Sequence, residues 1–528
     1  MQNDNEKSGP TEKKDQREDK AAQFIQPLLE TGITLFHDQY KNGYIAWKET
    51  SRQKIIRLDS REFKRWFSHK IFKETRKALS KDLLEKCVNI LQGKAIYEEP
   101  EIELHLRFAD HDGAWWYDLG DGLSVRVDDD GWTMVQNTPI LFRSFKHQKT
   151  QVLPEMPERS LNDLLFEYAP APSHPQIRML LLVWTVVSLI PGFPHPILVA
   201  VGPQGARKTT LNKILKQIID PSQIETFAPQ TDMRELIQIA SHHFLIPLDN
   251  LSHINEDFSD ILCRLVSGSG FSKRELYTDD SDIVYNFRRL VTINGINNVV
   301  EKPDLLERSL IIALERPDQY KEEKVLFAEF NAALPKILGA LFDVLARTKA
   351  LAKKELQLEG IGQYRMADFV RWGSAAAEAL GYAPEVFLEA WQNNSVRQHE
   401  EAIDSSPFAQ TVIALMENSD WDGTPTELLY ELRTKADSIQ IDHKRKPFPQ
   451  GANTVWKALQ VIKMTLESVG IKMETTRDKQ RHIKIYRPGR NTDDAVVTVD
   501  DIPKDAENIQ ENTKVDISDG NDGIFTFE

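Results

Sequence analysis

The stretch that decides the fold is Ile197-Leu-Val-Ala-Val201, followed by Gly202-Pro-Gln-Gly-Ala-Arg-Lys-Thr-Thr210 and Leu211-Asn-Lys-Ile-Leu215. It predicts a buried strand, a glycine-bearing loop and the first turns of a helix. Backbone N–H groups of such a loop and the helix N-terminus bind phosphate oxygens. The expected phosphate contacts are Gly202, Pro203, Gln204, Gly205, Ala206, Arg207, Lys208, Thr209 and Thr210.

Within this loop, Lys208 is expected to reach the β- and γ-phosphates of a nucleotide, and Thr209 to hold Mg²⁺. The usual pattern places glycine directly before the lysine, where this chain has Arg207. Two alternatives stay open at this point: a chance glycine-rich turn before a helix, and a site that binds nucleotide without hydrolysing it.

A second predicted strand runs from Phe244 to Leu248 and ends in Asp249-Asn250. A carboxylate at this place can hold Mg²⁺ through water, so Asp249 is a second candidate for the metal. Its alternative is a helix N-cap or turn residue. Asn250 stands where hydrolysing ATPases usually have glutamate; it can orient water but cannot take its proton, a role open to Glu256 or Asp257.

The third strand, Leu290–Ile293, ends in Asn294, which can contact the γ-phosphate or its attacking water. Arg308 precedes a fourth apolar run, Leu310–Leu314. It is expected to point at the nucleotide of a neighbouring subunit and to stabilise transition-state charge there. The alternative for Arg308 is a surface salt bridge.

The order Lys208, Asp249, Asn294, Arg308 resembles the AAA+ ATPases of the superfamily 3 and MCM-like helicase group. It looks especially like the replication proteins of prophages, plasmids and integrative elements. The resemblance spans roughly residues 160–380 and rests on GPQGARKTTL, LIPLDNLS, GSGFSKRELYTDD, LVTINGI, KPDLLERSL and RMADFVRW.

That resemblance implies an α/β fold of the ASCE P-loop type, with a parallel-sheet core and a helical lid. It implies ATP and Mg²⁺ as cofactors and a homo-oligomer, in a hexameric ring, with ATP bound between subunits. The catalytic set would be Lys208, Asp249, Asn250, Asn294 and Arg308. Arg365 and Arg371 are candidates for the sensor arginine of the lid.

Composition divides the chain into six parts. Our predicted parts are a disordered arm (1–20), an α+β N-terminal domain (21–160), the AAA+ core (161–350), a helical lid and linker (351–405), a basic winged-helix-like domain (406–490) and an acidic disordered tail (491–528). Asp-Gly clusters in the N-terminal domain are expected to form turns rather than metal sites. Trp115, Trp116 and Trp132 are expected to pack rather than stack on bases.

Two segments are candidates for DNA contact. Lys273 and Arg274 lie on an expected hairpin between Asp249 and Asn294; the alternatives are an ordinary charged hairpin or a subunit contact. The 442–490 segment carries twelve Lys or Arg against four acids, net +8. Its expected helices and β-wing favour a nucleic-acid groove over a protein-docking role. The candidate contacts are Lys457, Arg477, Lys479 and Arg481.

The formal net charge of −14 would by itself argue against a nucleic-acid partner, but residues 491–528 alone hold eleven acids and two lysines. Two cysteines exclude a disulfide framework. The longest apolar run, Met179–Ile190, is too short to span a bilayer, and the charged first residues do not form a signal peptide. We therefore expect a cytoplasmic protein without a membrane partner.

The predicted function is an ATP-dependent oligomeric DNA motor, namely a replicative helicase of a mobile genetic element that acts on single-stranded or forked DNA. The alternative is a nucleotide-gated DNA-binding or assembly switch, such as an origin binder or a defence-type ATPase, without unwinding. A third interpretation, a primase–helicase, lacks a convincing acidic triad in residues 21–160.

Overall fold

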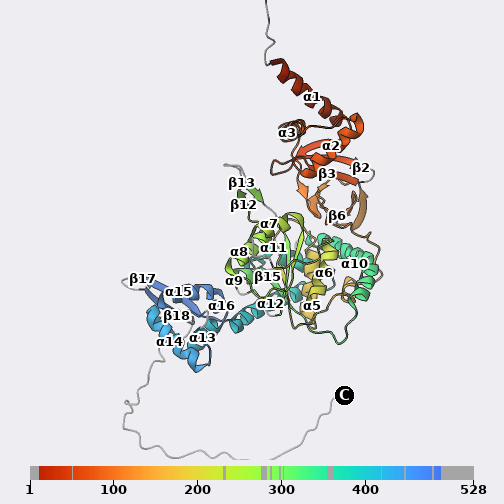
Figure 1. The fold of residues 1–528 in the computed structure, drawn as a ribbon. Helices are drawn as coiled ribbons and strands as arrows, with labels where there is room; N and C mark the ends of the chain where they lie inside the picture. Colours follow the sequence, from red (N-terminus) through yellow and green to blue (C-terminus); the bar gives the residue numbers. More distant parts are fainter. Residues whose placement is uncertain are drawn as a thin grey trace, which may run out of the picture.

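The computed structural model describes residues 11–488, apart from 50–51, 230–232, 275–281, 286–287, 297–298, 301, 354–360, 418, 445–447 and 478–480. The N-terminal region, the central α/β region and the C-terminal region follow one another in space as they do in the chain (Figure 1). The expected arm 1–20 lies partly within this range, because helix α1 (Thr11–Leu29) begins at Thr11. The tail 491–528 lies outside the described residues.

The N-terminal region opens with a small antiparallel sheet of β1 (Thr34–His37), β2 (Gly43–Glu49) and β3 (Arg52–Arg57). Helices α2 (Arg61–Thr75) and α3 (Lys81–Tyr97) each begin at a serine that accepts a hydrogen bond from an N–H in the first turn. The apolar faces of these helices share one hydrophobic core with the sheet.

A second antiparallel sheet follows, with strand order β5-β6-β7-β8. Its strands are β5 (Phe108–His111), β6 (Ala114–Gly120), β7 (Leu123–Val127) and β8 (Trp132–Gln136), and β4 (Leu104–His105) pairs with β9 (Leu141–Phe142). Trp115 and Trp116 are buried, and the indole N–H of Trp132 donates to Asp343 Oδ1 at 2.7 Å. The three tryptophans therefore pack, as predicted.

The central region is built on a sheet of four parallel strands in the order β11-β14-β10-β15. The strands are β10 (Ile197–Val201), β11 (Leu245–Leu248), β14 (Leu290–Gly295) and β15 (Ser309–Ala313). Phe227 adds a parallel bridge to Leu248 beyond β11. The predicted α/β class with a parallel sheet is confirmed.

Helices connect and cover these strands, because parallel neighbours need crossover connections. They are α4 (Leu161–Phe166), α5 (Pro175–Val187), α6 (Lys208–Ile219), α7 (Met233–His242), α8 (Glu256–Ser267) and α9 (Pro303–Leu306). The hairpin expected between Asp249 and Asn294 is present as β12 (Phe271–Arg274) and β13 (Asp282–Tyr285), and it projects from the central region (Figure 1).

Further helices pack against α5 and against one another: α10 (Glu323–Ala352), the short 3-10 helix Ile361–Gln363, α11 (Ala367–Ala379) and α12 (Pro384–Ser405). In the described part of the chain, α10 alone is long and apolar enough to cross a membrane by length and composition. Its apolar face lies in the same core as β6, β7 and α5, and core helices of globular proteins pass the same test.

The C-terminal region has its own hydrophobic core. Its elements are α13 (Pro407–Leu415), β16 (Trp421–Gly423), α14 (Pro425–Ser438), α15 (Ala452–Val461), α16 (Lys463–Ser468), β17 (Lys472–Arg477) and β18 (Arg481–Tyr486). The strand order β16-β18-β17 places the final hairpin beside the short first strand. Thr424 and Glu427 form a capping box that fixes the start of α14.

A buried ion cluster joins the second antiparallel sheet to the end of helix α6. Arg107 Nε donates to Asp220 Oδ1 at 3.0 Å, and Lys216 Nζ donates to Asp220 Oδ2 at 2.6 Å. Asp220 Oδ2 also accepts the backbone N–H groups of Phe244 and Leu245. All three charged side chains are almost completely buried, so the cluster fixes α6 against the neighbouring region.

Candidate functional site

The loop between β10 and α6 has a backbone that few side chains allow. Gly202 has φ +148°, and a Cβ atom added there would lie 2.1 Å from the carbonyl oxygen of Leu314. Gly205 has φ +90°. Glycine is the residue that adopts these angles without steric cost, so both glycines are required by the loop itself.

Replacing Gly202 with alanine should therefore distort the loop. The strain of such a position is about 1–3 kcal/mol, which corresponds to roughly 5- to 150-fold in nucleotide affinity if the loop binds phosphate. Titration with a fluorescent ATP analogue measures it. Gly93→Ala is the matched control, because nothing lies within 4 Å of its added Cβ in α3. Equal affinities for the two variants would show that the loop does not hold the nucleotide.

Arg207 stands where the usual loop pattern has glycine, and the structure shows how an arginine is accommodated there. Arg207 has φ +60°, the left-handed conformation in which glycine normally precedes the lysine. Such a conformation costs a non-glycine residue about 1–2 kcal/mol. The guanidinium of Arg207 donates to the carbonyl of Tyr168 at 2.9 Å, and this contact holds the residue in place. The substitution therefore keeps the course of the loop.

Lys208 is the first residue of α6 and points back over the loop. Its Nζ donates to the carbonyl oxygens of Gly202 at 2.7 Å and Pro203 at 2.9 Å. Burial lowers the pKa of Lys208, and the nearby charge of Asp249 partly offsets that effect. Among the described residues, the ammonium of Lys208 thus donates only to uncharged carbonyl oxygens, which an anion can replace as acceptor.

Three of the predicted side chains meet at the carboxyl edge of the sheet. Thr209 Oγ1 donates to Asp249 Oδ1 at 2.9 Å, and Asn294 Nδ2 donates to the same oxygen. Asn294 Oδ1 in turn accepts the backbone N–H of Asn250 at 2.6 Å. Because β14 lies between β10 and β11, Asn294 stands between the loop and Asp249. A hydroxyl and a carboxylate oxygen are ligands that Mg²⁺ prefers, so the residues present fit that ion.

Asn250 has φ +59° and is exposed. Asparagine is enriched in this left-handed conformation, whereas glutamate there costs about 1–2 kcal/mol. The backbone thus gives a local reason for asparagine at this position. Glu256 and Asp257 lie in the first turn of α8, where acids suit the helix dipole.

Two residues beside the loop were missed by sequence reasoning. Arg316 Nε donates to the carbonyl of Gln204 at 2.7 Å, and the hydroxyl of Tyr320 donates to the carbonyl of Gly205 at 3.1 Å. Both follow β15, whose carboxyl end lies at the same edge of the sheet as the loop. A basic residue shortly after the end of a parallel strand was the available signal.

Arg308 lies apart from these residues, at the amino end of β15 and hence at the opposite edge of the sheet. Its Nη1 contacts the carboxylate of Asp304 at 2.5 Å, and Arg365 pairs with the same carboxylate at 2.8 Å. Arg371 is exposed on α11. Within one chain, Arg308 therefore does not meet Lys208 or Asp249.

The candidate DNA contacts lie on two hairpins and one helix. Lys273 and Arg274 belong to β12, and Lys457 is exposed on α15. Arg477 and Arg481 occupy paired backbone positions at the end of the β17–β18 hairpin, while Lys479 lies outside the described residues.

The fold and site define a parallel α/β protein whose central sheet carries a candidate phosphate loop at its carboxyl edge. Residues 163–385 match the family described as actinomycete integrative conjugative element replication protein. Residues 408–498 match the C-terminal domain of that replication protein. These two segments are thus similar to the replication proteins of integrative conjugative elements.

Among solved structures, an active helicase, Cch of SCCmec type IV, aligns at a TM-score of 0.44 with 10% identity, over 86% of this chain and 92% of that one. The apo A form of the NrS-1 C-terminal region aligns at 0.39 with 13% identity, over 88% and 98%. Structural alignments with TM-scores below 0.5 carry no statement about function. No curated protein matches the chain.

Proposed function

We propose that the chain is an ATP-dependent oligomeric DNA motor, a replicative helicase of a mobile genetic element. The observation that carries this proposal is the cluster of Thr209, Asp249 and Asn294 beside the glycine loop. The match of residues 163–385 to an integrative-element replication family supports a role in replication.

ATP and Mg²⁺ would occupy the carboxyl edge of the sheet. The loop N–H groups and Lys208 would bind phosphate oxygens, and Thr209 with Asp249 would hold the metal. When bound, Mg²⁺ would neutralise negative charge on the phosphate groups. Asn294 orients Asp249 through its side-chain amide and would contact the γ-phosphate or its attacking water. The strand order, the loop and the following helices favour an AAA+ core with α11 and α12 serving as its lid.

Assembly into a ring would bring the two edges of the sheet together between subunits. Arg308 and Arg365 share Asp304 at the edge opposite the loop. In a head-to-tail ring, this edge of one subunit faces the nucleotide of the next. Arg308 is then the arginine that one subunit supplies to the nucleotide of the next. This agrees with its position away from the phosphate loop of its own chain.

DNA contact would come from the C-terminal region and the β12–β13 hairpin. The elements α13 to β18 have the order of a winged helix, with α15 exposing Lys457 and the final hairpin carrying Arg477 and Arg481. In a basic segment of this form, most contacts would be to DNA phosphates. The protein would act in the cytoplasm on single-stranded or forked DNA.

The direct test measures ATP hydrolysis with and without single-stranded DNA, then strand displacement from a forked duplex, beside electron microscopy of the assembled protein. We expect stimulation by DNA, ATP-dependent unwinding and rings. Hydrolysis without any strand displacement would contradict the helicase assignment.

A second candidate function is a nucleotide-gated DNA-binding or assembly switch, favoured by Asn250, which cannot take a proton from water. Slow turnover suits a switch. Single-turnover hydrolysis followed by slow release, with DNA affinity that depends on the bound nucleotide and with no unwinding, would support it over the motor.

A further inference from the structure

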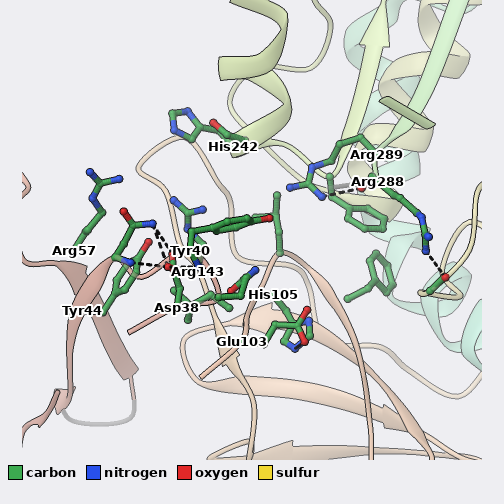
Figure 2. Close-up of a pocket in the computed structure, with 18 residues that line it drawn as sticks. Asp38, Tyr40, Tyr44, Arg57, Glu103, His105, Arg143, His242, Arg288 and Arg289 are labelled. Carbon is green, nitrogen blue, oxygen red and sulfur yellow. Dashed lines mark hydrogen bonds and ion pairs between the residues drawn. The ribbon is translucent and has the colours of Figure 1, made fainter. Parts of the chain in front are cut away.

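A cleft of about 490 Å³ lies between the N-terminal region and the central region, away from the phosphate loop. Figure 2 shows its walls: Asp38, Tyr40, Tyr44 and Arg57 from one side, and Arg288 and Arg289 from the other. No residue of the loop 202–210 lines it. The cleft is therefore a site separate from the proposed ATP site.

Four arginines line this cleft against two carboxylates: Arg57, Arg143, Arg288 and Arg289 face Asp38 and Glu103. Asp38 is held by its own turn, since its Oδ1 accepts the backbone N–H groups of Tyr40 and Asn42 at 2.9 Å. Arg57 pairs with Asp59 outside the lining. The cleft keeps an excess of positive charge.

Among the residues that the structure describes, no acid forms an ion pair with Arg143 or Arg288. Arg143 lies over the ring of Phe145 at 5.1 Å and forms no ion pair among the described residues. Arg288 donates to the carbonyl oxygens of Ser267, at 3.3 Å, and Gly192. The two carbonyl groups orient Arg288 and the Phe145 ring lies beside Arg143, and neither kind of contact cancels the guanidinium charge.

The protonation states of His242 and Arg289 are consistent with a net positive charge in the cleft. Burial, together with the nearby His147 and Arg143, lowers the pKa of His242 to about 4. Burial and the charge of Arg143 lower the pKa of Arg289 to about 10, so it stays protonated at neutral pH. At pH 7 the histidine is neutral and the arginines carry the charge.

The cleft also has aromatic walls and a defined position. Tyr40 extends into it from the N-terminal region. Phe108 packs against Phe244 where the two regions meet, with ring centroids 4.8 Å apart and the ring planes tilted. Strand β13 ends at Tyr285, three residues before Arg288. The hairpin proposed to grip DNA thus leads directly into the wall of the cleft.

We propose that this interregion cleft binds the phosphodiester backbone of a single DNA strand, with Arg143 and Arg288 as phosphate contacts and Tyr40 as a stacking surface. Arginines on opposite walls suit consecutive phosphates along a strand, and aromatic rings stack on any base. Cavities of about 300–1,000 Å³ enclose small ligands, so the volume fits a nucleotide-sized part of that strand. The inference rests on the proposed DNA motor and adds a second site to it.

Arg143→Ala and Arg288→Ala test the proposal through binding of fluorescein-labelled oligo(dT), measured by anisotropy across a salt series. Each variant should bind about 5-fold more weakly, and the slope of log affinity against log salt should fall by about 0.7 for each lost phosphate contact. Arg347→Ala and Arg61→Ala, two exposed arginines outside the cleft, are the matched controls. Thermal unfolding shows whether each variant keeps its fold.

Iododeoxyuridine placed in the oligonucleotide supplies a second measurement. Light should crosslink it to the peptide that contains Tyr40, and Arg143→Ala should reduce that crosslink. If the wild type binds oligo(dT) and both cleft variants keep its affinity and its salt slope, the proposal that the cleft binds DNA is wrong. The proposal of a DNA motor would still stand. A wild type that binds no DNA would overturn both.

A free nucleotide is the other source of the same phosphate chemistry. Excess deoxynucleoside triphosphate should leave the Tyr40 crosslink in place if the cleft holds a strand. Loss of the crosslink at a nucleotide concentration that saturates the cleft would show that it is a nucleotide site and would overturn the proposal.

Discussion

Replacing Lys208 with alanine should lower the rate of ATP hydrolysis by about 100-fold or more, the magnitude lost when one preorganised electrostatic contact is removed from a transition state. Lys208 Nζ lies within 3 Å of two loop carbonyls and is the one ammonium placed over this loop by the contacts described above. The rate of phosphate release with and without single-stranded DNA measures the effect.

The matched control is Lys213→Ala, five residues further along the same helix. Lys213 Nζ pairs with Glu323 at 2.6 Å instead of with a loop carbonyl, so its loss should leave hydrolysis near the wild-type rate. DNA-stimulated hydrolysis that survives Lys208→Ala would refute the assignment of the loop. A comparable loss in both variants would indicate damage to α6 rather than to the nucleotide site.

The parallel sheet and the position of the site were predictable because both depend on local patterns. Apolar runs of four or five residues gave β10, β11, β14 and β15, and the polar residue after a run lies at the carboxyl edge of the sheet. This rule places Asp249 and Asn294 together without any knowledge of side-chain contacts. Their roles in catalysis stay predictions.

The contacts between regions were not predictable, since they join residues far apart in the chain. Arg107 and Asp220 are separated by 113 positions, and nothing in the sequence around either residue indicates its partner. The cleft has the same origin, because Arg143 and Arg288 come from different regions and line one cleft only after folding. Such pairs follow from how the regions pack, which hydrophobic periodicity does not specify.

Replacing Asp220 with asparagine should destabilise the protein by about 3–5 kcal/mol, since it leaves Lys216 and Arg107 charged and buried without a counter-ion. Burial alone would raise the pKa of Asp220, but the charges of Lys216 and Arg107 outweigh it and hold that pKa well below its usual range. The carboxylate is therefore ionised in the folded state. Scanning calorimetry should show the affected transition shifted down by roughly 10 °C.

The control and the pH dependence separate this ion cluster from an ordinary surface pair. Glu329→Gln removes the exposed partner of Lys321, at 2.8 Å, and should change stability by less than about 1 kcal/mol. Because the folded pKa of Asp220 is depressed, its contribution is complete above the unfolded pKa of about 3.9 and is lost as the pH falls below it. The gap between wild type and Asp220→Asn should thus be constant near neutrality and narrow in acid. A gap that stays constant into acid, or an Asp220→Asn protein as stable as wild type, would mean that apolar packing alone joins α6 to the neighbouring sheet.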